Sequence, residues 1–143
     1  MLRSQDEWSN ELGPAIRAAQ ESIGWAQHLV IVYPLWLGAM PALLKGFLEQ
    51  TLRPGFAFPK GEAKLAAGLL KPKTARVVVT MGMPAFFFRW YFGAHSVKTL
   101  KRNILAFCGI KPTSETLIGS VEGNAGKRRK WLKRLRALGQ EGR

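Results

Sequence analysis

The stretch HLVIVYPLWLGAMPALLKGFLEQT, residues 28–51, decides the fold class of this chain. Residues 28–33 form a continuous apolar run of strand length that is rich in β-branched side chains. Such a run is typical of a strand covered on both faces by helices. A turn over 34–38 follows, and then the spacing predicts a helix over 42–51. The side chains expected to face inward from this helix are Leu44, Phe47, Leu48 and Thr51.

The alternation of helices and strands continues on both sides of this stretch. Strands separated by helices predict an α/β fold with a parallel sheet and right-handed crossovers, here as a single domain over residues 1–143. An irregular segment is expected over 53–73 and an aromatic loop over 86–92. The further elements expected, in chain order, are a helix over 10–26, a second buried strand over 74–80, a helix over 96–107, a weaker strand within 111–121 and a helix over 125–138.

Composition excludes several classes of protein. Hydrophobic residues make up 47% of the 143 residues and charged residues 22%, so the chain can build a core and is not disordered by composition. The single cysteine, Cys108, cannot form an internal disulfide, and no Cys/His cluster predicts a metal site. The longest apolar stretches, such as 29–33 and 84–88, are far too short for a transmembrane segment. A cytoplasmic, reducing location is therefore expected.

The chain is strongly basic, with 22 Lys and Arg against 9 Asp and Glu and a net charge of +13. The excess is concentrated in residues 127–136, where basic side chains surround an apolar stripe of Trp131, Leu135 and Leu138. One interpretation is an amphipathic terminal helix whose basic face is simply solvated. The other is a protein that binds nucleic acid or an anionic surface through this segment. We expect no sequence-specific binding to nucleic acid.

Two strand ends have the composition of a ligand site. Ligands of open α/β sheets bind beyond the carboxyl ends of the strands. Residues 33–41 combine large flat side chains with glycine and proline, so their backbone amides can lie against a planar ligand. Residues 80–84 place a hydroxyl at Thr80 and allow close backbone approach at Gly82. Each could equally be an ordinary strand-to-helix turn.

The segment YPLWLGAMPALLKGFLEQTLRPGFAF, residues 33–58, resembles the signature of the flavodoxin-like NAD(P)H dehydrogenase (quinone) family. The resemblance covers essentially the whole chain and is weaker after Gly82. It implies a three-layer flavodoxin-like sheet in which the strand over 74–80 lies between the other two. It also implies an enzyme that holds FMN or FAD, takes hydride from NAD(P)H and passes two electrons to a quinone or similar acceptor, commonly as a homodimer.

The resemblance carries over to particular residues. His95 is near the position of a catalytic histidine of some members, whereas Phe88, which has no hydroxyl, falls near the position of a catalytic tyrosine. The residues that match the two flavin-bordering loops are Pro34, Leu35, Trp36 and Leu37 in the first and Thr80, Met81 and Gly82 in the second.

The chain departs from the family at its N-terminus. The family begins with a strand, a serine-containing loop that binds the flavin phosphate, a helix and a second strand. About ten residues precede the first expected helix here, whereas such a unit needs about 30. We therefore expect an N-terminally incomplete fold with three strands and an exposed edge at 29–33, and weak flavin binding. The missing N-terminal unit has three alternative explanations: a reading-frame start placed too late, a truncated gene product, or a unit that lies on another chain. An alternative function is that of a regulatory subunit of a potassium efflux system.

Overall fold

The computed structural model describes residues 11–60 and 68–142 of the chain. Its three strands are β1 (His28–Pro34), β2 (Thr74–Thr80) and β3 (Lys111–Ile118). They form one sheet in the order β1-β2-β3, and both strand pairs are parallel. The expected parallel pairing and the central place of residues 74–80 are confirmed, and β1 is an edge strand.

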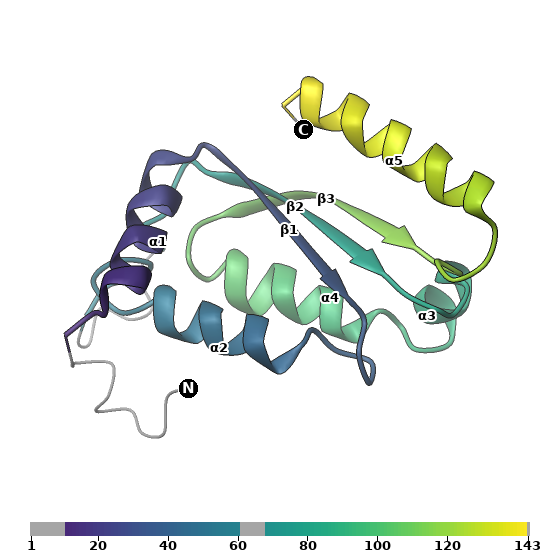
Figure 1. Ribbon diagram of the computed structural model, residues 1–143. Helices are drawn as coiled ribbons and strands as arrows, with labels where there is room; N and C mark the ends of the chain where they lie inside the picture. The colour runs from purple at the N-terminus through teal and green to yellow at the C-terminus, as the bar shows by residue number, and fades with distance from the viewer. Residues whose placement is uncertain (1–10, 61–67, 143) are drawn as a thin grey trace.

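Helices lie on both faces of the sheet, which gives the expected three layers (Figure 1). The helices α2 and α4 lie against one face, whereas α5 lies over the other, and α1 stands at the end where the strands begin (Figure 1). The bounds of the helices are α1 Pro14–Trp25, α2 Ala42–Thr51, α3 Ala85–Trp90, α4 His95–Thr99, the π-helical segment η3 Leu100–Leu105, and α5 Ala125–Gln140.

The hydrophobic core lies between the sheet and the layer of α2, α4 and η3. Ala75, Val77 and Val79 alternate along β2 with zero exposure and point into this layer, as the period of two in a strand requires. Cys108 is also buried here. The helical side chains that meet these residues are Leu48, Leu52, Val97, Leu100 and Leu105.

The second face of the sheet is less covered than the sequence predicts. On β1, Val30 is 56% exposed and Val32 is 61% exposed, so the expectation that this strand is covered on both faces is wrong. The physical reason is that α5, the helix on this face, buries none of its residues and leaves β1 open. On the other face Phe47 of α2 is 41% exposed, which also differs from its predicted inward position.

Two predicted elements differ in kind. The expected aromatic loop over 86–92 is largely the helix α3, because Pro84 is compatible with a helix start and the buried Phe88 anchors the turn. The expected helix over 96–107 starts one residue earlier, at His95, and continues as η3, in which Ala106 N donates to Lys101 O at 3.0 Å. Helix α1 is shorter than predicted, and Asn10 lies outside the described residues.

Residues 11–60 and 68–142 contain neither a membrane-spanning helix nor a metal-binding cluster. None of their helices is both long and apolar enough to cross a bilayer. The same residues hold no group of three His, Cys, Asp or Glu side chains that could bind a metal ion.

Candidate functional site

The strand register brings three loops to one edge of the sheet. Pro34, Thr80 and Ile118, at the carboxyl ends of the three strands, lie side by side in register. Leu35 N donates to Thr80 O at 2.8 Å, and Met81 N donates to Ile118 O at 2.9 Å. The expectation that residues 34–38 and 80–84 emerge on the same edge is therefore confirmed, and the loop after β3 joins them.

The first loop is a tight turn with unusual backbone geometry. Trp36 and Ala39 exchange two backbone hydrogen bonds, each of 2.9 Å, around Leu37 and Gly38. Both central residues have positive φ, +47° for Leu37 and +78° for Gly38. Such a φ is natural for glycine but costs about 1–2 kcal/mol for leucine. The turn leaves the amides of Leu37 and Gly38 without a hydrogen bond to any described residue, and the Trp36 side chain is 62% exposed.

The second loop also presents free backbone donors. Met81 is 3% exposed and holds the start of the loop, whereas Gly82 is exposed. Within residues 11–60 and 68–142, the amides of Gly82 and Met83 find no hydrogen-bond acceptor. The Glu122 carboxylate lies near Gly82, since a β-carbon built on that glycine would be 3.7 Å from its Oε1.

The third loop, residues 119–124, packs tightly against the second. Ser120 N donates to Met83 O at 3.1 Å, and Val121 N donates to Met81 O at 3.2 Å. A β-carbon at Gly119 would stand 2.2 Å from Ala85 N, so only glycine fits there. Sequence reasoning missed both Gly119 and Glu122, although their place at the carboxyl end of the third expected strand was a usable signal.

The three loops form a site suited to a planar polar heterocycle. Two pairs of consecutive unbonded amides, at 37–38 and 82–83, follow neighbouring strands. Free N–H groups can donate to ring oxygens and nitrogens, and an exposed indole beside them can cover an apolar ring face. The described residues at this edge thus offer orientation by hydrogen bonds and shielding by an aromatic wall.

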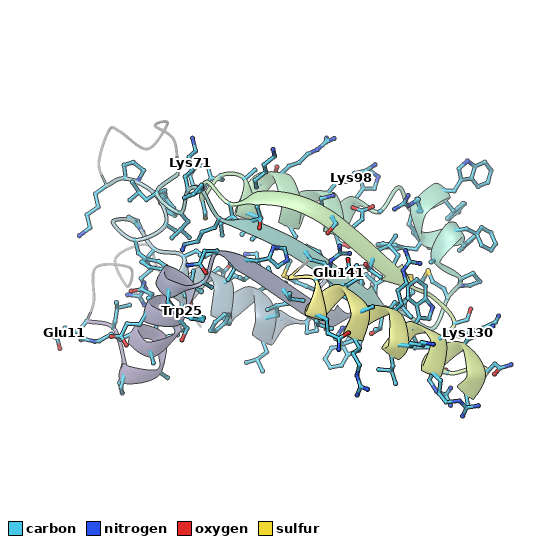
Figure 2. All side chains as sticks on the ribbon, turned by 90° about the horizontal axis from the view of Figure 1, so that it is seen from above. Glu11, Trp25, Lys71, Lys98, Lys130 and Glu141 are labelled. Carbon is cyan, nitrogen blue, oxygen red and sulfur yellow. The ribbon has the colours of Figure 1, made fainter. Side chains whose placement is uncertain are left out.

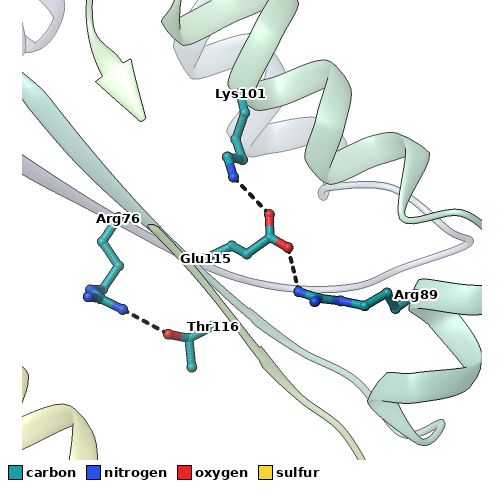
Figure 3. A network of polar contacts seen from close by, with 5 residues as sticks. All are labelled: Arg76, Arg89, Lys101, Glu115 and Thr116. Carbon is teal, nitrogen blue, oxygen red and sulfur yellow. Dashed lines mark hydrogen bonds and ion pairs between the residues drawn. The ribbon is translucent and has the colours of Figure 1, made fainter. Parts of the chain in front are cut away.

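An ion-pair network fixes α3 beside this edge (Figure 3). Glu115 of β3 accepts a hydrogen bond from Arg89 of α3 at 2.6 Å and one from Lys101 of η3 at 2.9 Å. Burial raises the pKa of Tyr33 to about 12, and the charge of Glu115 contributes to the shift. Because Glu115 bridges two helical segments, it sets the place of α3 relative to the sheet.

Two further predicted positions, Phe88 and His95, lie outside the residues of the three loops. Phe88 is 2% exposed, so the residue near the family's tyrosine position belongs to the core and cannot touch a ligand. His95 is the exposed first residue of α4, and its ring folds back over Gly93, whose β-carbon would be 2.7 Å from Nε2.

A profile of the family described as flavodoxin-like fold matches residues 2–140, and the parallel sheet with its site at the carboxyl edge agrees with it. The chain belongs to the flavodoxin-like fold family. Of the residues matched to its flavin-bordering loops, the structure brings 34–37 and 80–82 together at one edge. It does not join His95 to them by any hydrogen bond among the described residues.

Several proteins similar to this chain are oxidoreductases by name. The chain is 32% identical over 123 residues to an uncharacterized NAD(P)H oxidoreductase of Haemophilus influenzae, covering 85% of this chain and 60% of that protein. It is 32% identical over 69 residues to an FMN-dependent NADH:quinone oxidoreductase of Ruegeria pomeroyi, covering 48% and 34%. The solved NAD(P)H:quinone oxidoreductase of Methanothermobacter marburgensis superposes with a TM-score of 0.79 at 23% identity, covering 98% and 75%. The chain thus spans about three fifths of the Haemophilus protein.

Proposed function

We propose that this protein is an NAD(P)H-dependent flavin oxidoreductase that transfers two electrons to a quinone-type acceptor. The observation that carries the proposal is the pair of loops after β1 and β2, which present four unbonded backbone amides at one edge of the sheet. Its relatives from Haemophilus influenzae and Ruegeria pomeroyi are named as an NAD(P)H oxidoreductase and an NADH:quinone oxidoreductase.

The residues present fit the ring of a flavin. The amides of Leu37, Gly38, Gly82 and Met83 are free to donate to the polar edge of an isoalloxazine, and Trp36 can shield it from water. A bound flavin supplies the hydride chemistry, whereas the protein positions it and tunes its electronics. FMN is the favoured flavin, because the Ruegeria relative is FMN-dependent by name. The residues proposed to border the ring are Pro34, Leu35, Trp36, Leu37, Thr80, Met81 and Gly82.

The chain's own contacts set the spacing of the two ring loops. The hydrogen bond from Leu35 N to Thr80 O joins them directly, and the bond from Met81 N to Ile118 O fixes the second loop to the sheet. Such rigid support keeps donors at fixed positions relative to a ring, which is what orienting a cofactor for hydride transfer requires. The free amides are held by backbone bonds, so their place does not depend on side-chain rotamers.

Ligand titration tests the ring site. Neither strand-to-helix loop, residues 35–41 or 81–84, contains a serine or threonine, so Thr80 at the end of β2 is the one hydroxyl side chain among the proposed ring-bordering residues. We expect riboflavin and FMN to bind residues 1–143 weakly and with similar affinity, and the purified chain to be nearly colourless. Trp36→Ala should weaken both ligands about tenfold, a loss of about 1.4 kcal/mol. The control Trp25→Ala, at an 80% exposed position of α1, should change neither.

Three results of this titration would refute the ring site. One is the absence of riboflavin binding at any concentration tested, and another is an equal effect of the two tryptophan variants. Stoichiometric flavin on the purified chain would instead refute the weak binding that we expect. NAD(P)H-dependent menadione reduction, followed in the same samples with saturating FMN, tests the reaction itself.

His95 is proposed as the catalytic residue that steadies charge on the reduced flavin or the acceptor. Its imidazole is exposed at the start of α4, on the segment that follows the second ring loop. General acid–base groups contribute typically 10²–10⁴-fold in rate, so His95→Gln should lower kcat of menadione reduction by about 10²-fold. Riboflavin affinity should stay unchanged in this variant. Unaltered kcat would remove His95 from the mechanism.

A homodimer is the proposed assembly. The groove between α1 and α2 is lined by apolar side chains, among them Ile16, Leu43 and Phe47, and Leu43 is 87% exposed. Exposed apolar surface of this kind is buried in stable assemblies. Sedimentation equilibrium should give a dimer, and Leu43→Glu should shift it to monomer. Leu132→Glu, a change at a 67% exposed position of α5, is the control that should leave the dimer intact.

We place the protein in the cytoplasm. Its single cysteine is a buried free thiol, which suits a reducing compartment. Immunodetection of the native chain after cell fractionation tests this location, and recovery of the protein from the periplasm or medium would contradict it.

A further inference from the structure

The outer face of α5 carries a dense positive charge that the protein does not neutralise. Residues 127–136 contain seven Lys and Arg, and residues 125–140 contain no Asp or Glu. None of the ion pairs among the described residues involves this helix. The side chains of Arg129, Lys130 and Lys133 are exposed, and none of them forms an ion pair with another described residue. Trp131 is half-buried, and the Arg134 guanidinium lies 5.3 Å from the centre of its ring.

A second exposed surface belongs to α3. Phe86 is 73% exposed and Trp90 is 86% exposed, one helical turn apart. They lie on the side of the helix opposite Phe88, which is 2% exposed and anchors α3 in the core. Arg89 also donates a hydrogen bond to Glu115 of β3, which fixes α3 to the sheet. The two exposed aromatic side chains are therefore presented by a helix that is held in place.

The two surfaces lie at the same end of the molecule. Helix α3 and the first turns of α5 both lie where the strands have their carboxyl ends (Figure 1). Seen from above, Lys130 projects at the end that α3 occupies, whereas Lys71 lies at the opposite end (Figure 2). A single flat partner can therefore reach the basic residues and the aromatic residues together.

We propose that this end of the protein docks on an anionic phospholipid surface. Basic side chains of α5 would lie against the lipid phosphates, and Phe86 and Trp90 would enter the headgroup region. Basic residues near an anionic leaflet and aromatic side chains at the membrane–water boundary are the two elements of peripheral membrane binding. The proposal concerns the docking surface and does not need the flavin chemistry.

Binding to a nucleic acid would explain the basic helix but not the exposed aromatic side chains of α3. A basic helix can contact the phosphates of a duplex, but duplex binding through phosphates gives no role to Phe86 and Trp90 beside it. A lipid surface accounts for both, because it offers phosphates and an apolar layer at successive depths. Docking at this end also turns the ring loops toward the membrane. If the proposed function holds, the acceptor is then a lipid-dissolved quinone.

Co-sedimentation with vesicles tests the docking. The full chain should bind vesicles of phosphatidylcholine with phosphatidylglycerol and should release them as salt rises. Each basic residue near an anionic surface contributes about fivefold in affinity, so the triple variant Arg129→Gln, Lys130→Gln, Lys133→Gln should bind about a hundredfold more weakly. Gln preserves the helix, which circular dichroism checks.

A matched control distinguishes the effect of this surface from the effect of lowering the net charge of the protein. The variant Lys71→Gln, Lys98→Gln, Arg102→Gln removes the same charge from exposed positions outside α5 and should bind like the parent. Helix α4, which holds Lys98, lies on the face of the sheet opposite α5 (Figure 1). Phe86→Ala with Trp90→Ala should lower vesicle affinity about tenfold. Equal binding to pure phosphatidylcholine, equal losses in both triple variants, or tighter binding to an oligonucleotide than to anionic vesicles would each overturn the proposal. None of these readouts needs flavin or activity.

Discussion

The tight contact between the second and third loops leaves no room for a side chain at Gly119. In Gly119→Ala the new β-carbon would stand 2.2 Å from Ala85 N and 2.7 Å from Met83 O. Both are backbone atoms, so no rotamer change can relieve the overlap and the two loops must move apart. Overpacking of this kind costs about 1–3 kcal/mol.

The separation also weakens two hydrogen bonds. The bonds from Ser120 N to Met83 O and from Val121 N to Met81 O span the same contact, and each contributes about 0.5–1.5 kcal/mol net. The total expected loss in the free energy of unfolding is therefore about 2–6 kcal/mol. Riboflavin affinity should fall as well, since the amides at 82–83 are displaced.

Urea unfolding followed by circular dichroism measures the loss, and amide hydrogen exchange at Ser120 and Val121 locates it. Gly24→Ala in α1 is the control, because a β-carbon there meets nothing within 4 Å. Alanine is the better helix former by about 1 kcal/mol, so this control should be neutral or slightly stabilising. A Gly119→Ala protein within about 0.5 kcal/mol of the parent would refute the reasoning, since surface substitutions away from tight contacts fall in that range.

Three further outcomes follow from buried and paired groups. Glu115→Gln should free α3 and cost about 1 kcal/mol in urea unfolding, a small value because Arg89 is largely exposed, and trypsin should then cut faster after Arg89. Burial first, and the charge of Glu115 second, raise the pKa of Tyr33 from 10.0 to about 12, so the folded state keeps a proton that the unfolded state loses. Stability should therefore fall as pH rises from 10 to about 12, and Tyr33→Phe should flatten this slope in urea titrations. Burial raises the pKa of the Cys108 thiol from 9.0 to about 11, so a thiol reagent should label it only at the rate of unfolding, and fast labelling of the native protein would contradict its burial.

The sequence alone determined the strand–helix alternation and the place of the ligand edge. The apolar, β-branched run at 74–80 matches β2 in both bounds, and the helix over 42–51 matches α2. Period and composition are local properties, so these elements can be read without knowing their neighbours. Because parallel strands have their carboxyl ends at the same edge of a sheet, the sequence also predicted that the two ring loops lie at one edge.

Only the tertiary structure decided how much of each element is covered. Val30 and Val32 belong to an apolar run like that of β2, yet they stay open, because no described helix covers β1 on that face. The burial of a strand depends on which elements pack against it, and the sequence of the strand alone does not specify those elements. The same holds for α3. Its aromatic sequence predicted a loop, whereas in the structure it is a helix whose Phe88 side chain is buried in the core.

The candidate site shows the same division. Sequence reasoning named the residues of the first two loops, but it missed Gly119, whose need for glycine arises from backbone atoms of residues 83–85, more than thirty positions earlier in the chain. It also placed Phe88 near a site position that the core occupies instead. A residue type and its spacing fix which backbone conformations are open to a loop. Which loops touch, and which side chains remain free for a ligand, is fixed only when the strands pair in register.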